Sequence, residues 1–289
     1  MRKVPVSFGY EFAHSTESTR RHTMHEFAVN GAENLVLTDS LLKQMLVDRM
    51  LAVRLQEEMA AEGLKFMDAH AGYGKFVDIN CPVPEARGEM IARHKLTLHM
   101  IAALGVKTIA FHTGNENAYP EYPLEVQMDF IKRSLDELLP LAEELGIVIC
   151  IENIWHQTNT PERLLEIKAC FPTDALGFCY DAGHANLMDK GRNNPESNPF
   201  KAWGNVTPAW DDQILEKMLP HVVNCHLHDN DGVTDQHRNP GDGNIDWAHI
   251  TGLLAKAPRL QVIQSEVIPV SANVAIKELC DKFFEVFGR

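Results

Sequence analysis

Eight short apolar runs recur along the chain, and segments with the periodicity of amphipathic helices separate them. The runs lack the polar alternation of a half-exposed sheet, which is typical of parallel strands that are buried on both faces. Eight strand-and-helix units in 289 residues, with no linker rich in Gly, Ser or Pro, favour an α/β fold, a single (β/α)8 TIM barrel over residues 1–289. The expected strands are residues 4–9, 35–39, 64–70, 108–112, 147–152, 176–181, 222–228 and 261–267.

Helical periodicity fills the segments between the runs. The expected helices are residues 41–61, 89–104, 124–145 and about 271–287, with a further helix that begins at Pro161. Gly105 and Gly146 follow two of these segments and are typical of helix ends. Residues 10–27 and 187–212 follow the first and sixth expected strands and are longer than plain connections. We expect these long βα loops to overhang the carboxyl ends of the strands, either as lids or as surface insertions.

Composition narrows the choice of partners. The formal net charge of −13 opposes binding to a phosphate backbone, so we do not expect nucleic acid as a partner. No apolar run approaches the roughly 18 residues of a membrane helix, and the start of the chain turns polar too early for a signal peptide. We therefore expect a cytoplasmic protein with no membrane partner. The six cysteines include no CxxC pair, and we expect them to be reduced, buried and inert.

Six of the apolar runs end in a side chain that can bind a metal ion. In a parallel barrel the carboxyl ends of all strands open on one face, so side chains from distant parts of the sequence converge there. Imidazole and carboxylate groups suit a divalent ion such as Mn, Co, Zn or Fe, and open coordination positions would make that ion a Lewis acid. The six residues are His70, His112, Glu152, Asp181, His226 and Glu266.

Three short motifs add polar residues at the same face. YDAGH places His184 three residues after its strand-end aspartate, a spacing at which both side chains can turn towards one cavity. HLHDNDG carries a second histidine, His228, and DQHRNPGDG brings Asp235 and His237 ahead of a tight turn. A single residue of this kind is more often only hydrogen-bonded at a barrel rim. Their joint occurrence indicates a metal centre.

The order of these motifs resembles that of the xylose isomerase-like TIM-barrel superfamily. The resemblance rests on FHTGN, IEN, YDAGH, HLHD, DxHxxPGxG and a final strand-end Glu, and it covers nearly the whole chain. The superfamily contains sugar and sugar-phosphate isomerases and epimerases, inosose dehydratases and endonuclease IV. The motifs are specific for the superfamily and do not name a substrate.

The epimerase branch of the superfamily implies a metal-dependent sugar isomerase or epimerase. The resemblance implies one divalent ion, commonly Mn or Co, bound by Glu152, Asp181, His226 and Glu266. It also implies that Glu152 and Glu266 form an acid/base pair, which moves a proton next to a carbonyl through a metal-stabilised enediolate. His184 would steady the substrate oxygens. The alternative is that both glutamates serve only as ligands.

The endonuclease IV branch offers a second interpretation, because its three-metal site uses more ligands. The matching positions here also include His70, His112, Asp235 and His237, which are candidate contacts to additional ions or to substrate. Three ions would support hydrolysis of a phosphodiester. The acidic charge and the few Lys and Arg residues in the expected long loops argue against DNA repair. So does VSFGYEF, which stands where those endonucleases carry a Gly-Ser-His type opening.

Aromatic and basic residues near the expected face are candidate contacts to a small-molecule sugar or polyol. We expect contacts from Trp155, which would stack on a sugar ring, from His228, and from Arg238, which would meet an anionic group. The chain has no Gly-rich phosphate cradle after the expected sixth and seventh strands, which favours a free or carboxylated sugar over a sugar phosphate.

Further aromatic residues have two possible roles. Phe8 and either Trp203 or Trp210 could also line the cavity, whereas we expect Trp247 to pack a loop onto the barrel. Two other functions stay open. One is a metal-dependent dehydratase or lyase acting on a cyclic polyol or oxidised sugar, and the other is a non-catalytic barrel that binds a sugar or metal. The Phe, Met and Trp residues of the long loops permit a homo-oligomer without requiring one.

Overall fold

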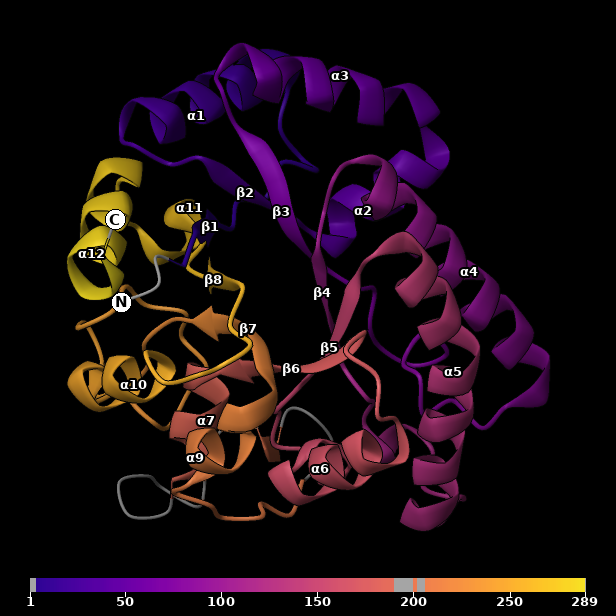
Figure 1. Ribbon diagram of the computed structural model, residues 1–289. Coiled ribbons are helices and arrows are strands. Elements are labelled where there is room, and N and C mark those ends of the chain that lie inside the picture. The colour runs from indigo at the N-terminus through magenta and orange to yellow at the C-terminus, as the bar shows by residue number, and fades with distance from the viewer. Residues whose placement is uncertain (1–3, 190–199, 202–205, 289) are drawn as a thin grey trace.

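The chain folds into a closed barrel of eight parallel strands (Figure 1). The computed structural model describes residues 4–189, 200–201 and 206–288. Each strand pairs with its neighbours in the sequence, and β8 pairs with β1 to close the ring. The predicted α/β barrel is therefore confirmed. The strands are β1 (Val6–Phe8), β2 (Asn34–Leu37), β3 (Lys65–His70), β4 (Thr108–Phe111), β5 (Val148–Glu152), β6 (Leu176–Asp181), β7 (Val222–Leu227) and β8 (Val262–Ser265).

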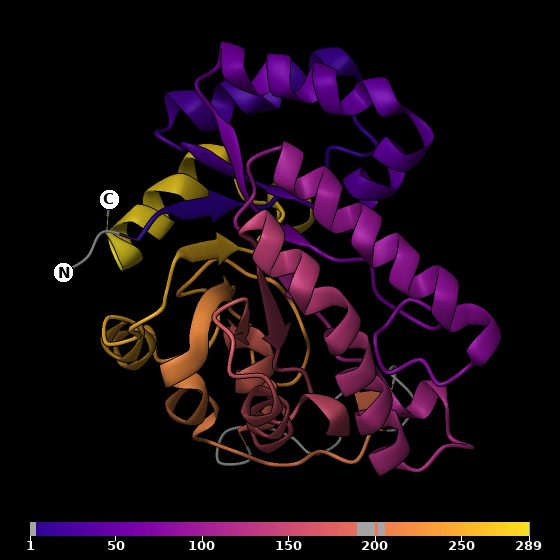
Figure 2. The same cartoon turned by 45° about the vertical axis from the view of Figure 1, so that its right-hand side comes forward.

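Helices form an outer ring around the strands (Figure 1). The α-helices are α1 (Glu17–Val29), α2 (Asp39–Val47), α3 (Arg49–Ala61), α4 (Pro84–Ala103), α5 (Leu124–Leu145), α6 (Pro161–Cys170), α7 (Ala182–Met188), α9 (Ile214–Met218), α10 (Trp247–Leu254), α11 (Pro269–Ala272) and α12 (Ile276–Phe287). The described residues also form the 3-10 helices η1 (Glu116–Ala118), η2 (Gln157–Asn159) and η3 (Leu219–His221). Two long helices, α4 and α5, lie side by side in both views (Figures 1 and 2). The ring buries the outward faces of the strands.

Two expected helices are each divided in the structure. The segment 41–61 is interrupted at Asp48, whose side chain accepts a hydrogen bond from the Met50 backbone N–H at 3.0 Å and caps α3. Asn273 separates α11 from α12 with a left-handed backbone at φ 54°. Short polar side chains bond to the nearby backbone and favour such ends over a continuous helix.

The expected loop over residues 10–27 is largely helical. Helix α1 begins at Glu17, and the Thr16 hydroxyl accepts a hydrogen bond from the Thr19 backbone N–H at 3.2 Å to cap it. The amphipathic pattern of α1 is weak because Arg20 is buried in an ion pair with Glu58. Much of the expected loop over residues 187–212 lies outside the described residues.

Side-chain alternation in β1 decides the place of Phe8. The Ser7 hydroxyl donates a hydrogen bond to Asp68, which belongs to β3. Phe8 points to the opposite face of the strand, where its ring lies 5.6 Å from Phe27 and 5.8 Å from Phe283. The expectation that Phe8 lines the cavity is wrong, because it packs between the barrel and its outer helices.

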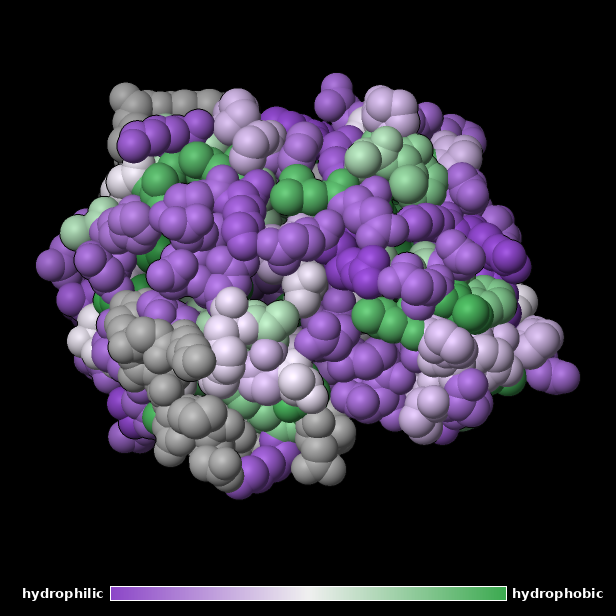
Figure 3. Space-filling model, turned by 90° about the horizontal axis from the view of Figure 1, so that it is seen from below, coloured by the Kyte–Doolittle hydropathy of each residue, from purple (hydrophilic) through white to green (hydrophobic). Residues whose placement is uncertain are grey.

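The surface is mostly polar. Figure 3 shows one face, on which apolar residues form small separate groups among polar ones. All six cysteines are free thiols, and five are buried, whereas Cys170 is exposed and departs from the expected burial. Among the helices in the described ranges, none is long and apolar enough to cross a membrane.

Candidate metal centre and cavity

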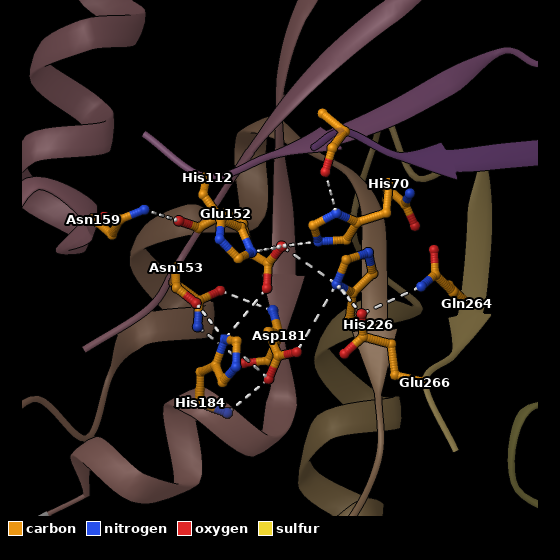
Figure 4. A network of polar contacts seen from close by, with 12 residues as sticks. His70, His112, Glu152, Asn153, Asn159, Asp181, His184, His226, Gln264 and Glu266 are labelled. Carbon is orange, nitrogen blue, oxygen red and sulfur yellow. Dashed lines mark hydrogen bonds and ion pairs between the residues drawn. The ribbon is translucent and has the colours of Figure 1, made fainter. Parts of the chain in front are cut away.

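The strand ends bring the predicted ligands together at one end of the barrel. Glu152 and Asp181 are the last residues of β5 and β6, and Glu266 directly follows β8. His226 lies in β7 as the register partner of Asp181. Figure 4 shows these four side chains pointing towards one another. Parallel strand ends in a closed barrel therefore place four distant residues in one cluster.

One nitrogen atom lies at the centre of this cluster. Nδ1 of His226 lies 3.0 Å from Glu266 Oε1, 3.4 Å from Glu152 Oε2 and 3.9 Å from Asp181 Oδ2. The side chains of His226, Asp181 and Glu152 are at most 1% exposed, and that of Glu266 is 17% exposed. Three carboxylates thus crowd one imidazole with almost no contact to water.

The polar atoms of the cluster fit a bound cation. Glu152 Oε2, Asp181 Oδ2 and both ring nitrogens of His226 are buried without a hydrogen-bond partner in the described part of the chain. Carboxylates that are buried together repel one another and lose their hydration, so this arrangement is costly unless a positive charge joins it. Three carboxylates and an imidazole are a suitable donor set for a divalent ion such as Mn, Co, Zn or Fe.

The charges of the cluster shift one another's pKa values. Burial acts to raise the pKa of Glu152, but the charge of His226 and a hydrogen bond from His184 hold that pKa well below its usual range. Burial acts on Glu266 in the same way, and the charge of His226 again lowers its pKa. Burial acts to lower the pKa of His226, whereas Cys179, Glu266 and Glu152 raise it well above its usual value. The two glutamates are therefore carboxylates at neutral pH.

His70 and His112 approach Glu152 from a second direction. The Nε2 atom of each lies 3.7 Å from Glu152 Oε2, and their ring centroids are 4.9 Å apart. The ring of Tyr73 lies 4.7 Å from that of His112. Burial lowers the pKa of His112 to about 3, so this ring is a neutral donor at physiological pH. These histidines could bind a second ion or a substrate oxygen beside Glu152.

A third group lies in the loop after β7. His237 Nε2 is 3.3 Å from Asp235 Oδ2, and the rings of His237 and His228 stack at 3.8 Å with 5° between their planes. His237 has a left-handed backbone, with φ at 48°. Strain of this kind persists only where surrounding contacts enforce it. Two contacts connect this group to the cluster. His228 Nε2 lies 3.3 Å from Asp181 Oδ2, and His184 Nε2 lies 3.7 Å from Asp235 Oδ2.

Side-chain amides fix the backbone beneath the ligands. Asn153 Oδ1 accepts a hydrogen bond from the Asp181 backbone N–H at 2.8 Å, and its Nδ2 donates to the Asp181 carbonyl at 2.9 Å (Figure 4). Asn159 Nδ2 donates to the Glu152 carbonyl at 3.1 Å. Asp181 Oδ1 accepts from the His184 backbone N–H at 2.6 Å and caps α7. These bonds tie β5, β6 and α7 together, so the candidate ligands Glu152 and Asp181 are held rigidly.

A cavity of about 530 Å³ opens over the cluster. The predicted site residues that line it are His70, His112, Glu152, Trp155, His184, Asp235, His237 and Glu266. Two predicted substrate contacts do not line it. His228 is fully buried, and Arg238 is exposed, with its guanidinium donating to the Asp242 carbonyl at 3.1 Å.

The aromatic predictions have mixed outcomes. Trp155 lines the cavity, and its ring meets that of His184 at 4.8 Å and 79°. Trp210 does not line the cavity, and Trp203 lies outside the described residues. The prediction that Trp247 packs a loop is confirmed. Its Nε1 donates to Asp229 Oδ2 at 2.8 Å, and its ring lies 5.7 Å from that of Phe287.

Sequence reasoning missed several residues of the cavity wall. They come from the loops after β1, β2 and β3 and include Glu11, Asp39, Tyr73, Lys75 and Asp78. Only Asp39 ends an expected run, residues 35–39, and it was not considered as a site residue; in the structure it is the first residue of α2. The other four lie outside the ends of the apolar runs, which were the signal used to find the candidate metal ligands. For Tyr73, Lys75 and Asp78, the available signal was the polar, Gly-rich segment AGYGK that directly follows the strand-end residue His70.

Known proteins share this architecture. The structure of a D-tagatose 3-epimerase-like protein has a TM-score of 0.73 at 20% identity, covering 98% of both chains. The 3-keto-D-glucoside 4-epimerase YcjR from E. coli has a TM-score of 0.69 at 17% identity, covering 98% of this chain and 99% of its own. The IOLI protein, described with a bound zinc atom, has a TM-score of 0.68 at 20% identity over 98% of both chains. At these identities the likeness shows a shared fold.

Sequence comparison identifies the family. The uncharacterized protein MJ1311 of Methanocaldococcus jannaschii is 28% identical over 179 residues, which is 58% of this chain. The match spans 55% of that protein, so this chain corresponds to about half the length of the relative. The sequence pattern of the family described as xylose isomerase-like TIM barrel matches residues 25–267. The chain therefore belongs to the xylose isomerase-like TIM-barrel family.

Proposed function

We propose that the protein is a divalent-metal-dependent sugar isomerase or epimerase that moves a proton next to a carbonyl group. The observation that carries this proposal is the pair Glu152 and Glu266. Both carboxylates line the cavity, and they lie 3.4 and 3.0 Å from the same nitrogen of His226. The sugar epimerases among the proteins of the same fold support a sugar substrate.

The residues divide the work of the proposed reaction. Glu152, Asp181, His226 and Glu266 would hold the ion, which when bound would polarise the substrate carbonyl and stabilise the charge that develops on its oxygen. The lowered pKa values leave Glu152 and Glu266 deprotonated at neutral pH, so each has a free carboxylate that could serve as the base. One glutamate would remove the proton from one face of the carbon next to the carbonyl. The other glutamate, after taking up a proton from solvent, would deliver that proton to the opposite face of the same carbon.

His184 and Trp155 would position the sugar. The Nδ1 atom of His184 lies 3.3 Å from Glu152 Oε1 and 3.0 Å from the Asn153 carbonyl oxygen, which orients the ring. Trp155 packs against this ring and, at 2% exposure, would support it from within the cavity wall.

Isotope exchange tests this proposal directly. Metal-loaded protein would be incubated with a panel of ketoses in deuterated water, and deuterium next to the carbonyl would be measured by NMR. Glu152→Gln and Glu266→Gln should each abolish exchange, whereas Glu285→Gln, on the exposed face of α12, should not. The metal content of each variant must also be measured. A variant that no longer binds the ion has lost a ligand, whereas a variant that keeps the ion but shows no exchange has lost the proton-transfer group. The proposal is contradicted if the wild-type protein catalyses exchange with none of the sugars in the panel.

A second candidate function is phosphodiester hydrolysis with up to three ions. It is favoured by the five overlapping sets of three potential ligands in the described residues, whose donor atoms lie within 4.8 Å of one another in each set. These sets include His70 with His112 and Asp235 with His237, beyond what one ion needs. Elemental analysis of protein purified without chelator separates the cases. Two or three ions per chain, together with hydrolysis of a model phosphodiester, would support the second function.

A dehydratase or lyase would use the same proton removal and then expel a hydroxyl group. Mass spectrometry of the product distinguishes this reaction, because the product of a dehydratase is lighter by one water molecule. An isomer keeps the mass of its substrate.

A further inference from the structure

The turn after β3 brings a positive charge to an acidic cavity. Among the described residues that line the cavity, Lys75 alone is a lysine or arginine. Its ammonium lies 5.5 Å from the ring centroid of Phe76 and 5.7 Å from that of Tyr119. Lys75 is exposed to solvent, and these cation–π contacts orient its side chain without neutralising it. No carboxylate forms an ion pair with Lys75 within the described ranges.

The nearby carboxylates of the wall already have other partners. Glu11 accepts hydrogen bonds from the Ala13 backbone N–H at 2.8 Å and from the Ser40 hydroxyl at 2.6 Å. Asp39 is paired with Lys43 at 2.5 Å. Because these carboxylates are engaged locally, the charge of the Lys75 ammonium has no internal counter-charge in the wall.

The turn that carries Lys75 is fixed by its own hydrogen bonds. Phe76 has a left-handed backbone at φ 67°, which is strained for a bulky residue. The Tyr119 hydroxyl accepts a hydrogen bond from the Phe76 backbone N–H at 2.8 Å. Asp78 Oδ1 accepts from the Gly74 backbone N–H, and the Gly74 carbonyl accepts from the Asp78 backbone N–H, both at 2.9 Å. The turn is thus set before a ligand arrives, as in a preorganised recognition site.

We propose that Lys75 binds a carboxylate group of the substrate, so that the enzyme acts on an acidic ketose in preference to a neutral one. This inference rests on the proposed function, whose metal cluster would hold the carbonyl end of the same molecule. A single ammonium matches the single charge of a carboxylate. A doubly charged phosphate ester would keep one uncompensated negative charge there, because Lys75 is the only lysine or arginine among the described residues of the wall. The wall therefore favours the smaller charge.

Matched substrate pairs test the inference. D-fructuronate and D-tagaturonate differ from D-fructose and D-tagatose by a carboxylate in place of the terminal hydroxymethyl group. For each pair, deuterium exchange gives kcat and KM, and calorimetry on the metal-loaded protein gives the dissociation constant independently of turnover. D-fructose 6-phosphate is included as the competing anion. Variants are Lys75→Gln, Lys75→Arg and the control Lys65→Gln, whose exposed side chain lies at the opposite end of β3.

The expected result is a wild-type preference for the acidic sugars that depends on Lys75. Lys75→Gln should raise KM and the dissociation constant for the acids about tenfold, the size expected for one charge-assisted hydrogen bond, and should leave those for neutral sugars unchanged. Lys75→Arg should retain most of the preference, and Lys65→Gln should retain all of it.

If exchange is observed, three results would overturn the inference. They are equal binding of acidic and neutral sugars by the wild type, an unchanged preference in Lys75→Gln, and tighter binding of D-fructose 6-phosphate than of D-fructuronate. Absence of exchange with every ketose contradicts the proposed function instead. In that event the calorimetric comparison still decides whether Lys75 selects a carboxylate, and failure of both acids to bind refutes it.

Discussion

Replacing Asp78 by asparagine should change how the stability of the protein depends on pH. Asp78 is 6% exposed, and its Oδ1 accepts the Gly74 backbone N–H at 2.9 Å. Burial raises the pKa of its carboxyl from 3.8 to about 7, against the opposing effect of hydrogen bonds from the Gly74 and Asn115 backbones. The folded protein therefore holds this proton more tightly than the unfolded chain does.

The sign and size of the effect follow from this difference in pKa. Between pH 3.8 and about 7 the folded state binds more protons at Asp78, so the free energy of unfolding falls as pH rises through that window. A difference of about three pKa units corresponds to about 4 kcal/mol at full titration. Asparagine keeps the shape and an oxygen acceptor but carries no charge. As pH rises from 4 to 8, the free energy of unfolding of Asp78→Asn should thus increase relative to that of the wild type, by up to about 4 kcal/mol.

Urea denaturation of metal-free protein at a series of pH values measures this difference. Subtracting wild type from variant at each pH cancels the titration of all other groups that the substitution leaves unchanged. Asp136→Asn, at an exposed position of α5, is the control and should give a difference that is nearly independent of pH. The reasoning is refuted if Asp78→Asn gives an equally flat difference, or if its advantage shrinks as pH rises.

Three further predictions concern the site and its supports. Because the pKa of His226 is raised well above its usual value, metal binding should release protons and weaken as pH falls, which calorimetry in buffers of different ionisation enthalpy would detect. An unchanged heat in all buffers would contradict this. Gly183→Ala should lower the free energy of unfolding by about 3 kcal/mol and reduce the metal content, because the added Cβ would lie 2.0 Å from Cε1 of the buried His228. Urea denaturation and elemental analysis measure the two effects, and wild-type values for both would count against this prediction. Trp247→Phe should cost about 1–2 kcal/mol, because Asp229 loses a hydrogen bond of 2.8 Å, and an unchanged urea midpoint would disprove that role.

The sequence by itself determined the barrel and the residues that converge in it. Parallel strands buried on both faces read as apolar runs, and the order of strand and helix restricts the topology to very few choices. Because all strands of such a barrel end on one face, a His, Asp or Glu at the end of a run is placed there whatever the loops do. Glu152 and Asp181 could be assigned to one cluster on that ground alone.

Only the tertiary structure decided which side chains meet and which reach the cavity. The alternation of side chains along β1 turns Phe8 away from the cavity, and a shift of the strand by one residue would have turned the Phe8 side chain towards the cavity. His228 follows the candidate ligand His226 by two residues, yet it is buried under the stacked ring of His237. Lys75 reaches the cavity through a strained turn held by distant Tyr119. Local pattern carries no information on such contacts, because they depend on how loops from different strands pack against one another.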